Sequence, residues 1–299
     1  MQKIIPHLWF DNQALEAARF YTSIFPNSSI GENSEYPEAG QEIHHQEAGS
    51  VMTVEFSLAG TSFLALNAGP IFKFNPSISF FVHCKDAEEV NTFYAKLSEG
   101  GEVLMELGSY PFSERYAWIA DKYGVTWQLS VAMGPVTQMI VPSLLFTQKM
   151  AGRAEEAIKL YTSIFPDSQI EMVSRYGEGM EPNDPQSLNY ASFVLCGQKF
   201  SAMDSSNEHK FVFNEAISLL VNCEDQEEID MYWKKLSADP QSEQCGWIKD
   251  TFGVSWQIVP ANMGELMSSG TKEQNERVMA AMLQMKKLDI AALKRAAQG

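Results

Sequence analysis

The sequence lacks the features that direct a chain into or across a membrane. No stretch approaches the ~20 consecutive apolar residues of a membrane span. Residues 1–6 (MQKIIP) show neither the basic start nor the long apolar region of a signal peptide. We therefore expect a cytoplasmic protein with no membrane partner.

Cysteine and basic residues are also scarce. The 299 residues include 4 cysteines and no CxxC pair, which argues against a disulfide scaffold and a structural zinc site. Lys and Arg number 22 against 38 Asp and Glu, so the formal net charge is −16. Because a chain of this charge repels phosphate backbones, we expect no nucleic-acid partner.

The main positive feature of the sequence is an internal repeat. Residues 21–26 (YTSIFP) recur letter for letter at 161–166. Residues 121–128 (DKYGVTWQ) return as residues 250–257 (DTFGVSWQ). The repeated segments keep the same order in both copies, so we interpret the chain as a tandem duplication of one module.

The first half of each copy has the periodicity of one strand, one helix and three strands. In the first copy, strand 4–10 precedes a helix whose apolar residues, from Ala14 to Tyr21, follow the i, i+3, i+4, i+7 spacing. Residues 51–58 then alternate between apolar and polar, which is typical of a strand with one buried face. The second copy repeats this order from strand 143–147.

The second half of each copy restarts with a strand and a helix. The strands are predicted at 78–84 and 217–223. Asp86 with Glu89 has the spacing of a helix capping box in the first copy, and residues 225 and 228 repeat it. Each module is therefore predicted to contain two βαβββ units.

A helical tail follows the second copy. Thr271 and Gln274 have the spacing of a helix capping box, and Val278, Met282 and Met285 form an apolar stripe. An apolar stripe on an added helix must be covered. It either folds back on the modules or packs on a second chain, in which case the protein forms a homodimer.

Paired βαβββ units resemble the vicinal-oxygen-chelate superfamily of glyoxalases, bleomycin-resistance proteins and extradiol dioxygenases. The amino-acid sequences of several segments resemble those of its PhnB-like branch, the "3-demethylubiquinone-9 3-methyltransferase" domains. The resemblance covers roughly residues 3–260. It is carried by residues 8–11 (LWFD), 20–26 (FYTSIFP), 66–70 (LNAGP), 72–75 (FKFN), 121–129 (DKYGVTWQL) and 245–260 (CGWIKDTFGVSWQIVP).

The resemblance implies an α+β fold of two glyoxalase-like modules, built from paired βαβββ units, with a C-terminal helical tail. We place module 1 at residues 1–134, module 2 at 141–262 and the tail at 270–299. Members of the superfamily bring two modules together to form a cup. Here one chain supplies both modules.

Metal-dependent members of this superfamily hold a divalent ion with His, Gln or Glu side chains from four strands. Transferred by position, the ligands in the first copy fall on His7 (or Ile5), Glu55, Ser77 and Gln128. In the second copy they fall on Ser143 (or Leu145), Ser192, Ala216 and Gln257. A metal site needs three or four converging ligands. We therefore predict no metal; if one binds, its ligands are His7, Glu55 and Gln128.

The aromatic residues suggest a pocket instead, because small-molecule sites are apolar cups with a few polar groups. Trp127 and Trp256 are read as core, and His83 as structural, since residue 222 is Asn in the second copy. Gln128 and Gln257 are expected to bond within the sheet or its pocket. The predicted pocket residues are His7, Trp9, Asn67, Phe74, Trp118, Gln128 and Gln257.

Three functions fit these observations. The first is a PhnB-like, metal-free protein that binds a small molecule and uses no cofactor. The alternative is a divergent metal-dependent enzyme of the superfamily, a lyase, isomerase or dioxygenase. The third is a scaffold or oligomerisation protein acting through the C-terminal helix. Whether the protein is an enzyme stays open, although the chain has no glycine-rich strand-to-helix turn of the kind that commonly holds a methyl donor.

Overall fold

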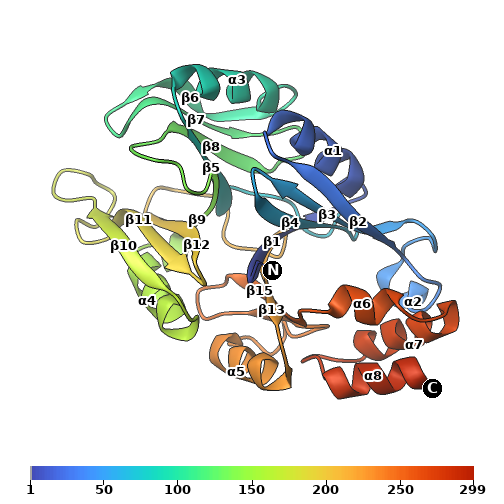
Figure 1. Cartoon of the computed structure of the whole chain (residues 1–299). Coiled ribbons are helices and arrows are strands. Elements are labelled where there is room, and N and C mark those ends of the chain that lie inside the picture. The colour runs from blue at the N-terminus through green and yellow to red at the C-terminus, as the bar shows by residue number, and fades with distance from the viewer. Residues whose placement is uncertain (1) are drawn as a thin grey trace.

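The computed structural model describes residues 2–299 and shows three βαβββ units, a fourth unit with one strand fewer than predicted, and a helical tail (Figure 1). None of the helices in these residues is long and apolar enough to cross a membrane. The elements of the first module are β1 Ile4–Phe10, α1 Ala14–Ile24, β2 Ser29–Glu35, α2 Gln41–His44, β3 Val51–Leu58, β4 Thr61–Asn67, β5 Ile78–Cys84, α3 Ala87–Leu97, β6 Glu102–Tyr110, β7 Ser113–Ala120 and β8 Thr126–Val131.

The second module repeats this order and then continues into three further helices, which form the tail. Its elements are β9 Ile140–Thr147, the 3-10 turn Gln148–Met150, α4 Ala154–Ile164, β10 Gln169–Arg175, β11 Leu188–Leu195, β12 Gln198–Ser205, β13 Ile217–Cys223, α5 Gln226–Leu236, β14 Trp247–Lys249, β15 Ser255–Pro260, α6 Met263–Ser268, α7 Lys272–Leu283 and α8 Ile290–Gln298.

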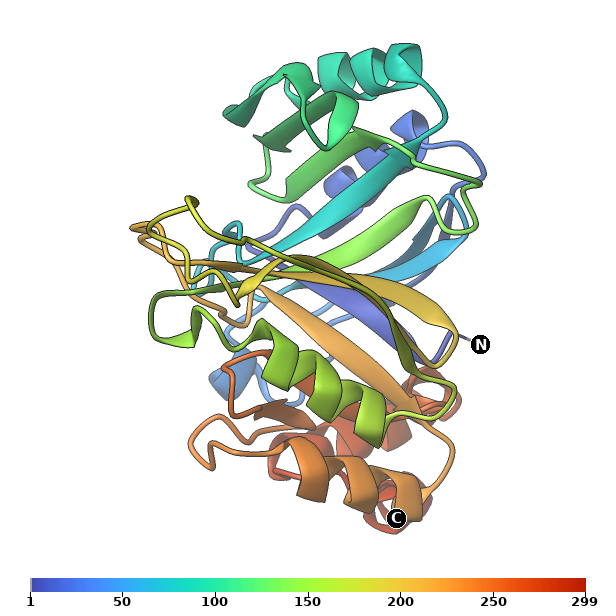
Figure 2. The ribbon, with the colours of Figure 1, turned by 90° about the vertical axis from the view of Figure 1, so that its left-hand side faces the viewer.

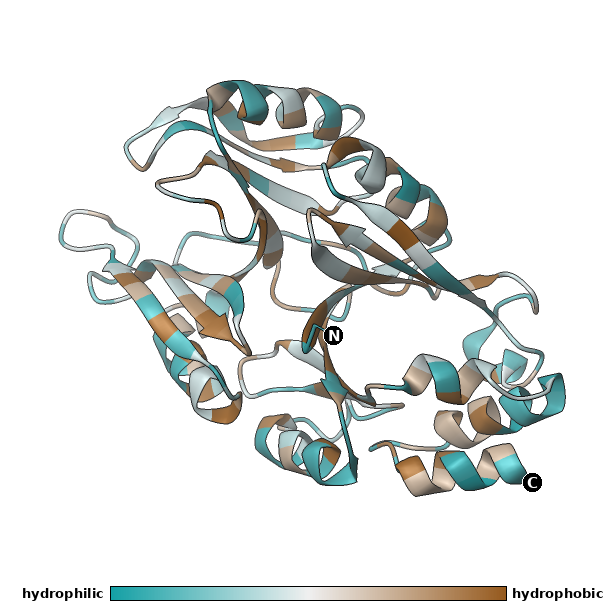
Figure 3. Cartoon of the chain, in the orientation of Figure 1, coloured by the Kyte–Doolittle hydropathy of each residue, from teal (hydrophilic) through white to brown (hydrophobic). Residues whose placement is uncertain are grey.

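The local signals for the helices act as predicted. The Asp86 side chain accepts a hydrogen bond from the backbone N–H of Glu89, which fixes the first turn of α3. The Glu89 carboxylate in turn accepts a hydrogen bond from the backbone N–H of Lys85, one residue before the cap. Asp225 begins α5 in the same way. The tail helix α7 has the full capping box predicted at Thr271. In Figure 3 each helix alternates between hydrophilic and hydrophobic residues, as amphipathic helices do.

The strands form two mixed sheets, and each sheet takes one unit from each module. Sheet A has seven strands in the order β14-β15-β13-β1-β4-β3-β2, and sheet B has eight in the order β10-β11-β12-β9-β5-β8-β7-β6. The modules meet at the sheet centres, where β1 pairs antiparallel with β13 and β5 with β9. The expectation that two modules come together within one chain is confirmed.

Helices cover one face of each sheet. The two helices of a module pack together, α1 with α3 through Phe25 and Phe93, and α4 with α5 through Phe165 and Tyr232. Figures 1 and 2 show these pairs at opposite ends of the molecule. We call the opposite face, which these helices leave uncovered, the inner face of the sheet.

A buried carboxylate ties the two units of each module together. Asp121 accepts hydrogen bonds from the Tyr21 hydroxyl on α1 (2.8 Å) and the Trp127 indole N–H on β8 (2.8 Å). It also accepts the backbone N–H groups of Tyr123 and Val125. In the second module, the carboxylate of residue 250 makes the equivalent four bonds. This node accounts for two of the repeated segments, and both tryptophans are fully buried, as predicted.

Replacing the node carboxylate by an amide is expected to destabilise the module. Burial raises the pKa of Asp121 to about 6, so the group is ionised at neutral pH and suits four donors. In Asp121→Asn an NH2 group faces those donors, and we expect a loss of about 3 kcal/mol in urea unfolding at pH 7.5. Asp250→Asn should cost a similar amount. A loss below about 0.5 kcal/mol, as expected for the exposed control Asp11→Asn, would contradict this role.

Candidate functional site

A row of hydroxyl groups crosses the inner face of sheet B. Ser192 on β11 lies opposite Ser201 on β12, Ser201 beside Ser143 on β9, and Ser143 opposite Ser79 on β5. Side chains that are paired across neighbouring strands point to the same face. The row ends at Gln128 on β8, whose side-chain N–H donates to the Ser79 hydroxyl at 2.7 Å.

Gln128 is held rigidly in this face. Its amide oxygen accepts a hydrogen bond from the Tyr116 hydroxyl on β7 (2.6 Å), while its NH2 group is fixed by Ser79. Burial raises the pKa of Tyr116, which keeps this phenol a hydrogen-bond donor. Gln257 makes the equivalent contact in sheet A, where it donates to Ser218 at 2.9 Å. The expectation that both glutamines bond within their sheets is confirmed.

Three polar atoms of this face have no hydrogen-bond partner in the chain. They are the hydroxyl oxygens of Ser143 and Ser201, which are 0% exposed, and the indole nitrogen of Trp118 on β7. Trp118 is paired with Gln128 and therefore points to the same face. Buried polar groups are nearly always satisfied, and leaving one unpaired costs roughly 1–3 kcal/mol. The inner face of sheet B thus carries buried hydrogen-bonding groups that the chain itself does not satisfy.

Aromatic and thioether side chains surround these polar groups. A separate apolar cluster on this face consists of Phe81, Tyr116 and Val141, with Met105, Tyr110, Trp118, Tyr190 and Met203 packed against it. Phe81 and Tyr190 meet edge to face with ring centroids 5.9 Å apart. The set contains no charged residue, so the floor of this face is apolar and neutral.

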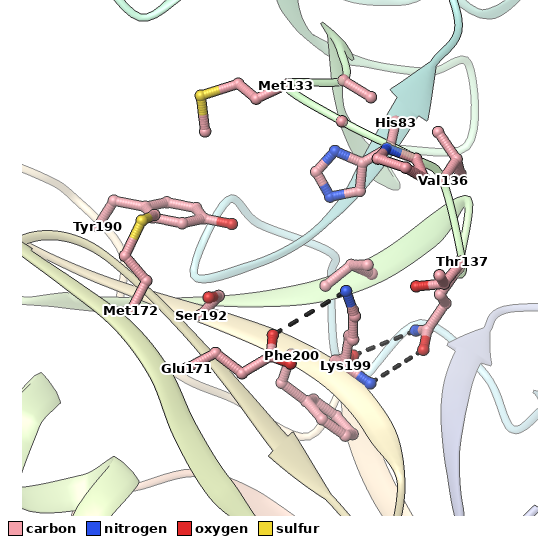
Figure 4. A pocket seen from close by; sticks show the side chains of 15 residues that line it. His83, Met133, Val136, Thr137, Glu171, Met172, Tyr190, Ser192, Lys199 and Phe200 are labelled. Atoms are coloured by element: carbon pink, nitrogen blue, oxygen red, sulfur yellow. Dashed lines mark hydrogen bonds and ion pairs between the residues drawn. The ribbon is translucent and has the colours of Figure 1, made fainter.

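A cavity of about 220 Å³ opens at one end of this face, next to the loop 132–138 that joins the modules. Figure 4 shows His83 and Tyr190 on either side of it, with Lys199 and Glu171 below. Its lining also includes Ser192, the last hydroxyl of the row, so the cavity and the polar row are continuous.

The charged groups of the cavity lie in its wall. The Lys199 ammonium is 4.0 Å from the Glu171 carboxylate, and both side chains are partly exposed. Burial and the nearby Lys199 charge lower the pKa of His83, so its imidazole is neutral at pH 7. The ring stacks on Phe81 at a centroid distance of 5.8 Å. His83, interpreted as structural from the sequence, therefore also lines the cavity.

The predicted residues of the first strand lie on the other sheet. His7 is on the inner face of sheet A, opposite Ser218 and next to Leu64, and is 3% exposed. Its Nδ1 atom has no hydrogen-bond partner in the chain, and burial lowers its pKa to about 3. Trp247 packs edge-on against the imidazole at 5.5 Å and against Trp9 at 5.9 Å.

Three of the predicted pocket residues have structural contacts. Asn67 accepts the N–H of Ala14 at the start of α1 and donates to the Val51 carbonyl, so its amide positions that helix. The Trp9 indole donates to the Gly69 carbonyl at 2.9 Å. Phe74 packs against the core residue Phe10 at 5.0 Å. None of these three side chains, nor the other four predicted pocket residues, lines the 220 Å³ cavity.

The predicted metal ligands do not come together. His7 and Glu55 lie on sheet A, two strands apart, whereas Gln128 belongs to sheet B. Glu55 is also exposed, and burial of its base together with Glu32 raises its pKa. Across residues 2–299 no three His, Cys, Asp or Glu side chains are grouped so that they could hold a metal ion.

The equivalent positions of sheet B hold Ser143, Ser192, Ser79 and Gln128. Hydroxyl and amide groups are weak ligands for the transition metals that imidazole and carboxylate bind. The donor set of sheet B therefore does not fit a divalent transition-metal ion. Ser77 and Ala216, assigned from the sequence to the opening strands, lie two residues before the inner-face serines 79 and 218.

The cavity residues His83, Tyr190 and Lys199 were not predicted. The alternation of β5 could have identified His83, because it shares a face with Ser79 and Phe81. Tyr190 and Lys199 come from the other module. Nothing in the sequence shows that β11 and β12 join the sheet that contains β5.

The family is decided by a direct comparison. A family model described as 3-demethylubiquinone-9 3-methyltransferase matches residues 2–130 and again residues 138–259. The chain belongs to this family. The PhnB-like resemblance and the tandem arrangement are confirmed, since two copies of the 3-demethylubiquinone-9 3-methyltransferase domain account for most of the chain.

Solved structures place this tandem member of the family beside two kinds of protein. The PhnB protein from Bacillus cereus is 42% identical over 44% of this chain and 100% of its own, with a TM-score of 0.40. Glyoxalase I from Zea mays is 10% identical over 87% of this chain and 92% of its own, with a TM-score of 0.53, which shows a shared fold. No curated protein matches the chain.

The unpaired hydroxyls of sheet B predict an unusual response to truncation. Removing a hydroxyl that bonds to nothing in the chain costs no hydrogen bond, so Ser143→Ala and Ser201→Ala should leave the free energy of unfolding unchanged or raise it by up to about 1 kcal/mol. Ser79→Ala is the matched control. It removes the acceptor of Gln128 and should cost about 1–2 kcal/mol in the same urea titration. Equal losses for all three serines would contradict the assignment.

His7 predicts a pH dependence of stability. An unfolded histidine binds a proton near pH 6.5, whereas folded His7 does so only near pH 3. Between these values the unfolded chain binds one proton more, so His7 lowers stability as the pH falls. From pH 7 to pH 5, the wild type should lose about 2 kcal/mol more than His7→Leu in urea unfolding. Parallel pH profiles would contradict the prediction, and exposed His45→Gln is the control.

Proposed function

We propose that this protein binds a small neutral molecule, without a metal, on the inner face of sheet B. The observation that carries the proposal is the combination of a cavity with buried, unpaired donors on one face. Ser192 lines the cavity, and the row from Ser192 leads to the orphan hydroxyls of Ser201 and Ser143. Small-molecule sites have this composition, an apolar lining with a few polar groups that fix orientation.

The side chains on the inner face of sheet B indicate which class of ligand would bind there. Tyr190 and Phe81 offer aromatic edges and faces, and Met172 offers an adaptable thioether, so the ligand should contain a flat apolar part. The orphan groups are two hydroxyls and an indole N–H, which can all donate. The floor carries no charge, and the two charged side chains of the cavity wall, Lys199 and Glu171, lie 4.0 Å from each other, so neither is left to pair with an ionic ligand. Burying an unpaired charge is costly. An uncharged aromatic compound with acceptor oxygens or nitrogens fits these conditions.

The alternative functions have less support. A metal-dependent lyase, isomerase or dioxygenase needs converging ligands, and within residues 2–299 no three His, Cys, Asp or Glu side chains are grouped to hold an ion. The family description names a methyltransferase, but the turn from β1 to α1 (residues 11–13, DNQ) has no glycine. A scaffold acting through the C-terminal helix needs a free apolar stripe. In the structure Met282 and Met285 of that stripe pack on sheet A.

The proposal is tested with N-phenyl-1-naphthylamine, a neutral aromatic probe that fluoresces in apolar sites. The wild type should bind it saturably. Ser192→Phe, which places a ring in the 220 Å³ cavity, should weaken binding at least tenfold without lowering thermal stability, because the ring fills space rather than displacing core atoms. Asn189→Phe adds the same ring at an exposed position of β11 and should bind the probe like the wild type.

Two outcomes would overturn the proposal. One is saturable binding of the probe by Ser192→Phe with wild-type affinity, which would place the site elsewhere. The other is an increase in thermal stability on addition of Zn, Ni, Mn or Fe at stoichiometric concentration that His7→Leu abolishes. Such a result would favour the metal-dependent alternative, since a metal that binds only the folded protein stabilises it.

A further inference from the structure

The inner faces of the two sheets have similar strand arrangements, but the chain that follows the last strand of each module differs. After β8 the chain passes through the loop 132–138, which borders the cavity of sheet B. After β15, the equivalent strand of the second module, the chain continues into α6, α7 and α8. Figure 1 shows these tail helices grouped beside α2 and next to the strands of sheet A. The tail folds back on the module instead of extending away from it.

The tail places apolar side chains on the inner face of sheet A. Leu288 is 0% exposed and packs with Leu220 and Val259 of the sheet. Met282 and Met285 pack against this cluster together with Ile5 and Leu64. Met is unbranched and flexible, so it fills irregular space without a unique fit. Residues 282–288, which we call the plug, therefore cover part of the inner face of sheet A, including Ile5, whose equivalent in sheet B, Val141, lines the cavity.

Within residues 2–299, the segment just before β14 is the one that binds the plug through backbone hydrogen bonds. The N–H groups of Cys245 and Gly246 donate to the carbonyls of Met285 and Lys286, each at 2.8 Å. Gly246 has φ +89°, and a Cβ atom there would lie 3.2 Å from Leu288 Cδ1, so a glycine permits this close approach. The Gln226 side chain binds the Leu288 carbonyl at 3.0 Å and anchors the end of the plug.

The charged contacts of the plug are all at the surface. Lys286 is 3.3 Å from Glu243, and Lys287 is 2.5 Å from Asp230, with three of the four side chains at least 40% exposed. Exposed ion pairs contribute roughly 0–1 kcal/mol each. The plug is thus held by a few hydrogen bonds, by the buried side chain of Leu288 and by adaptable methionine contacts, and its local opening would leave the modules folded.

The floor of sheet A carries the same kind of polar group as the floor of sheet B. His7 occupies in sheet A the position of Ser143 in sheet B, since each lies opposite the first inner-face serine of the neighbouring unit. Its Nδ1 is buried and unpaired, and next to it Gln257 is held by Ser218. In a purely apolar core an unpaired imidazole nitrogen would cost stability without any return. In a binding site the same nitrogen can form a hydrogen bond with a ligand.

We propose that the inner face of sheet A is a second binding site, and that the plug is its intramolecular occupant. A neutral aromatic ligand reaches His7 only after residues 282–288 have left. The chain thus has one open site and one closed site of related chemistry. The ligand class rests on the proposed function of sheet B, but the closure of sheet A by the plug does not.

The closed site predicts a specific affinity pattern. A ligand that must first displace the plug binds with an apparent Kd raised by the inverse of the open fraction. The variant Met282→Glu/Met285→Glu puts two carboxylates against an apolar face and should favour the open state. Ala280→Glu/Gln284→Glu adds the same charge at exposed positions of the tail and serves as its control.

Titrations with N-phenyl-1-naphthylamine in the Ser192→Phe background isolate sheet A. There the methionine double substitution should tighten binding at least tenfold, while the control double substitution leaves it unchanged. Unchanged affinity in the methionine variant overturns the second site. If the Ser192→Phe chain binds like the wild type before any plug substitution, it is the sheet B proposal that fails, so the two failures are distinguishable.

Cys245 provides a second test in the wild type, independent of any variant that might not fold. Its thiol lies 3.5 Å from the Met282 carbonyl beneath the plug, whereas Cys84 and Cys223 are buried in the core. Saturating probe should raise the rate of Cys245 alkylation by iodoacetamide at least fivefold, read by mass spectrometry, while Cys84 and Cys223 stay protected. Alkylation of Cys245 only together with Cys223, with or without probe, overturns the displaceable plug.

Discussion

The antiparallel pairing of β1 with β13 and of β5 with β9 is the constraint on which both inner faces depend. A single module ties its two units together through the buried node at Asp121, yet it leaves the first strand of each unit with an unpaired edge. An exposed strand edge is a template for another strand. The second module pairs with both of these strand edges, through β13 and β9. The pairing joins four half-sheets into two sheets, and the inner face of each contains residues of both modules.

This exchange explains which parts of the structure could be predicted. Strand 51–58, the capping aspartates and the tandem copies follow from local periodicity and spacing, and they are present as expected. Periodicity of two specifies which face a residue occupies but not which strand lies next to it. His7, Glu55 and Gln128 were therefore assigned correctly to polar faces but to one site, although the fold divides them between two sheets.

The inner faces of the two sheets differ in the polar side chains that they carry. Sheet B carries small hydroxyl groups at Ser143 and Ser201, surrounded by aromatic side chains. Sheet A carries a bulky imidazole at His7, and Trp247 packs against it. The cavity could not be predicted because it depends on the loop 132–138 and on side chains of two modules. The residues that line it come from several segments that are far apart in the sequence.

The tail gives a physical reason why only one face is open. An apolar inner face on both sheets would expose a large hydrophobic surface, which favours association with other chains. The loop 132–138 has to reach β9 and borders the cavity of sheet B, whereas the chain after β15 is free to fold back. Residues 282–288 bury the sheet A face with methionines, which pack adequately without a unique fit. Closure of this kind stabilises the free protein, although the Nδ1 atom of His7 on the same face has no hydrogen-bond partner in the chain.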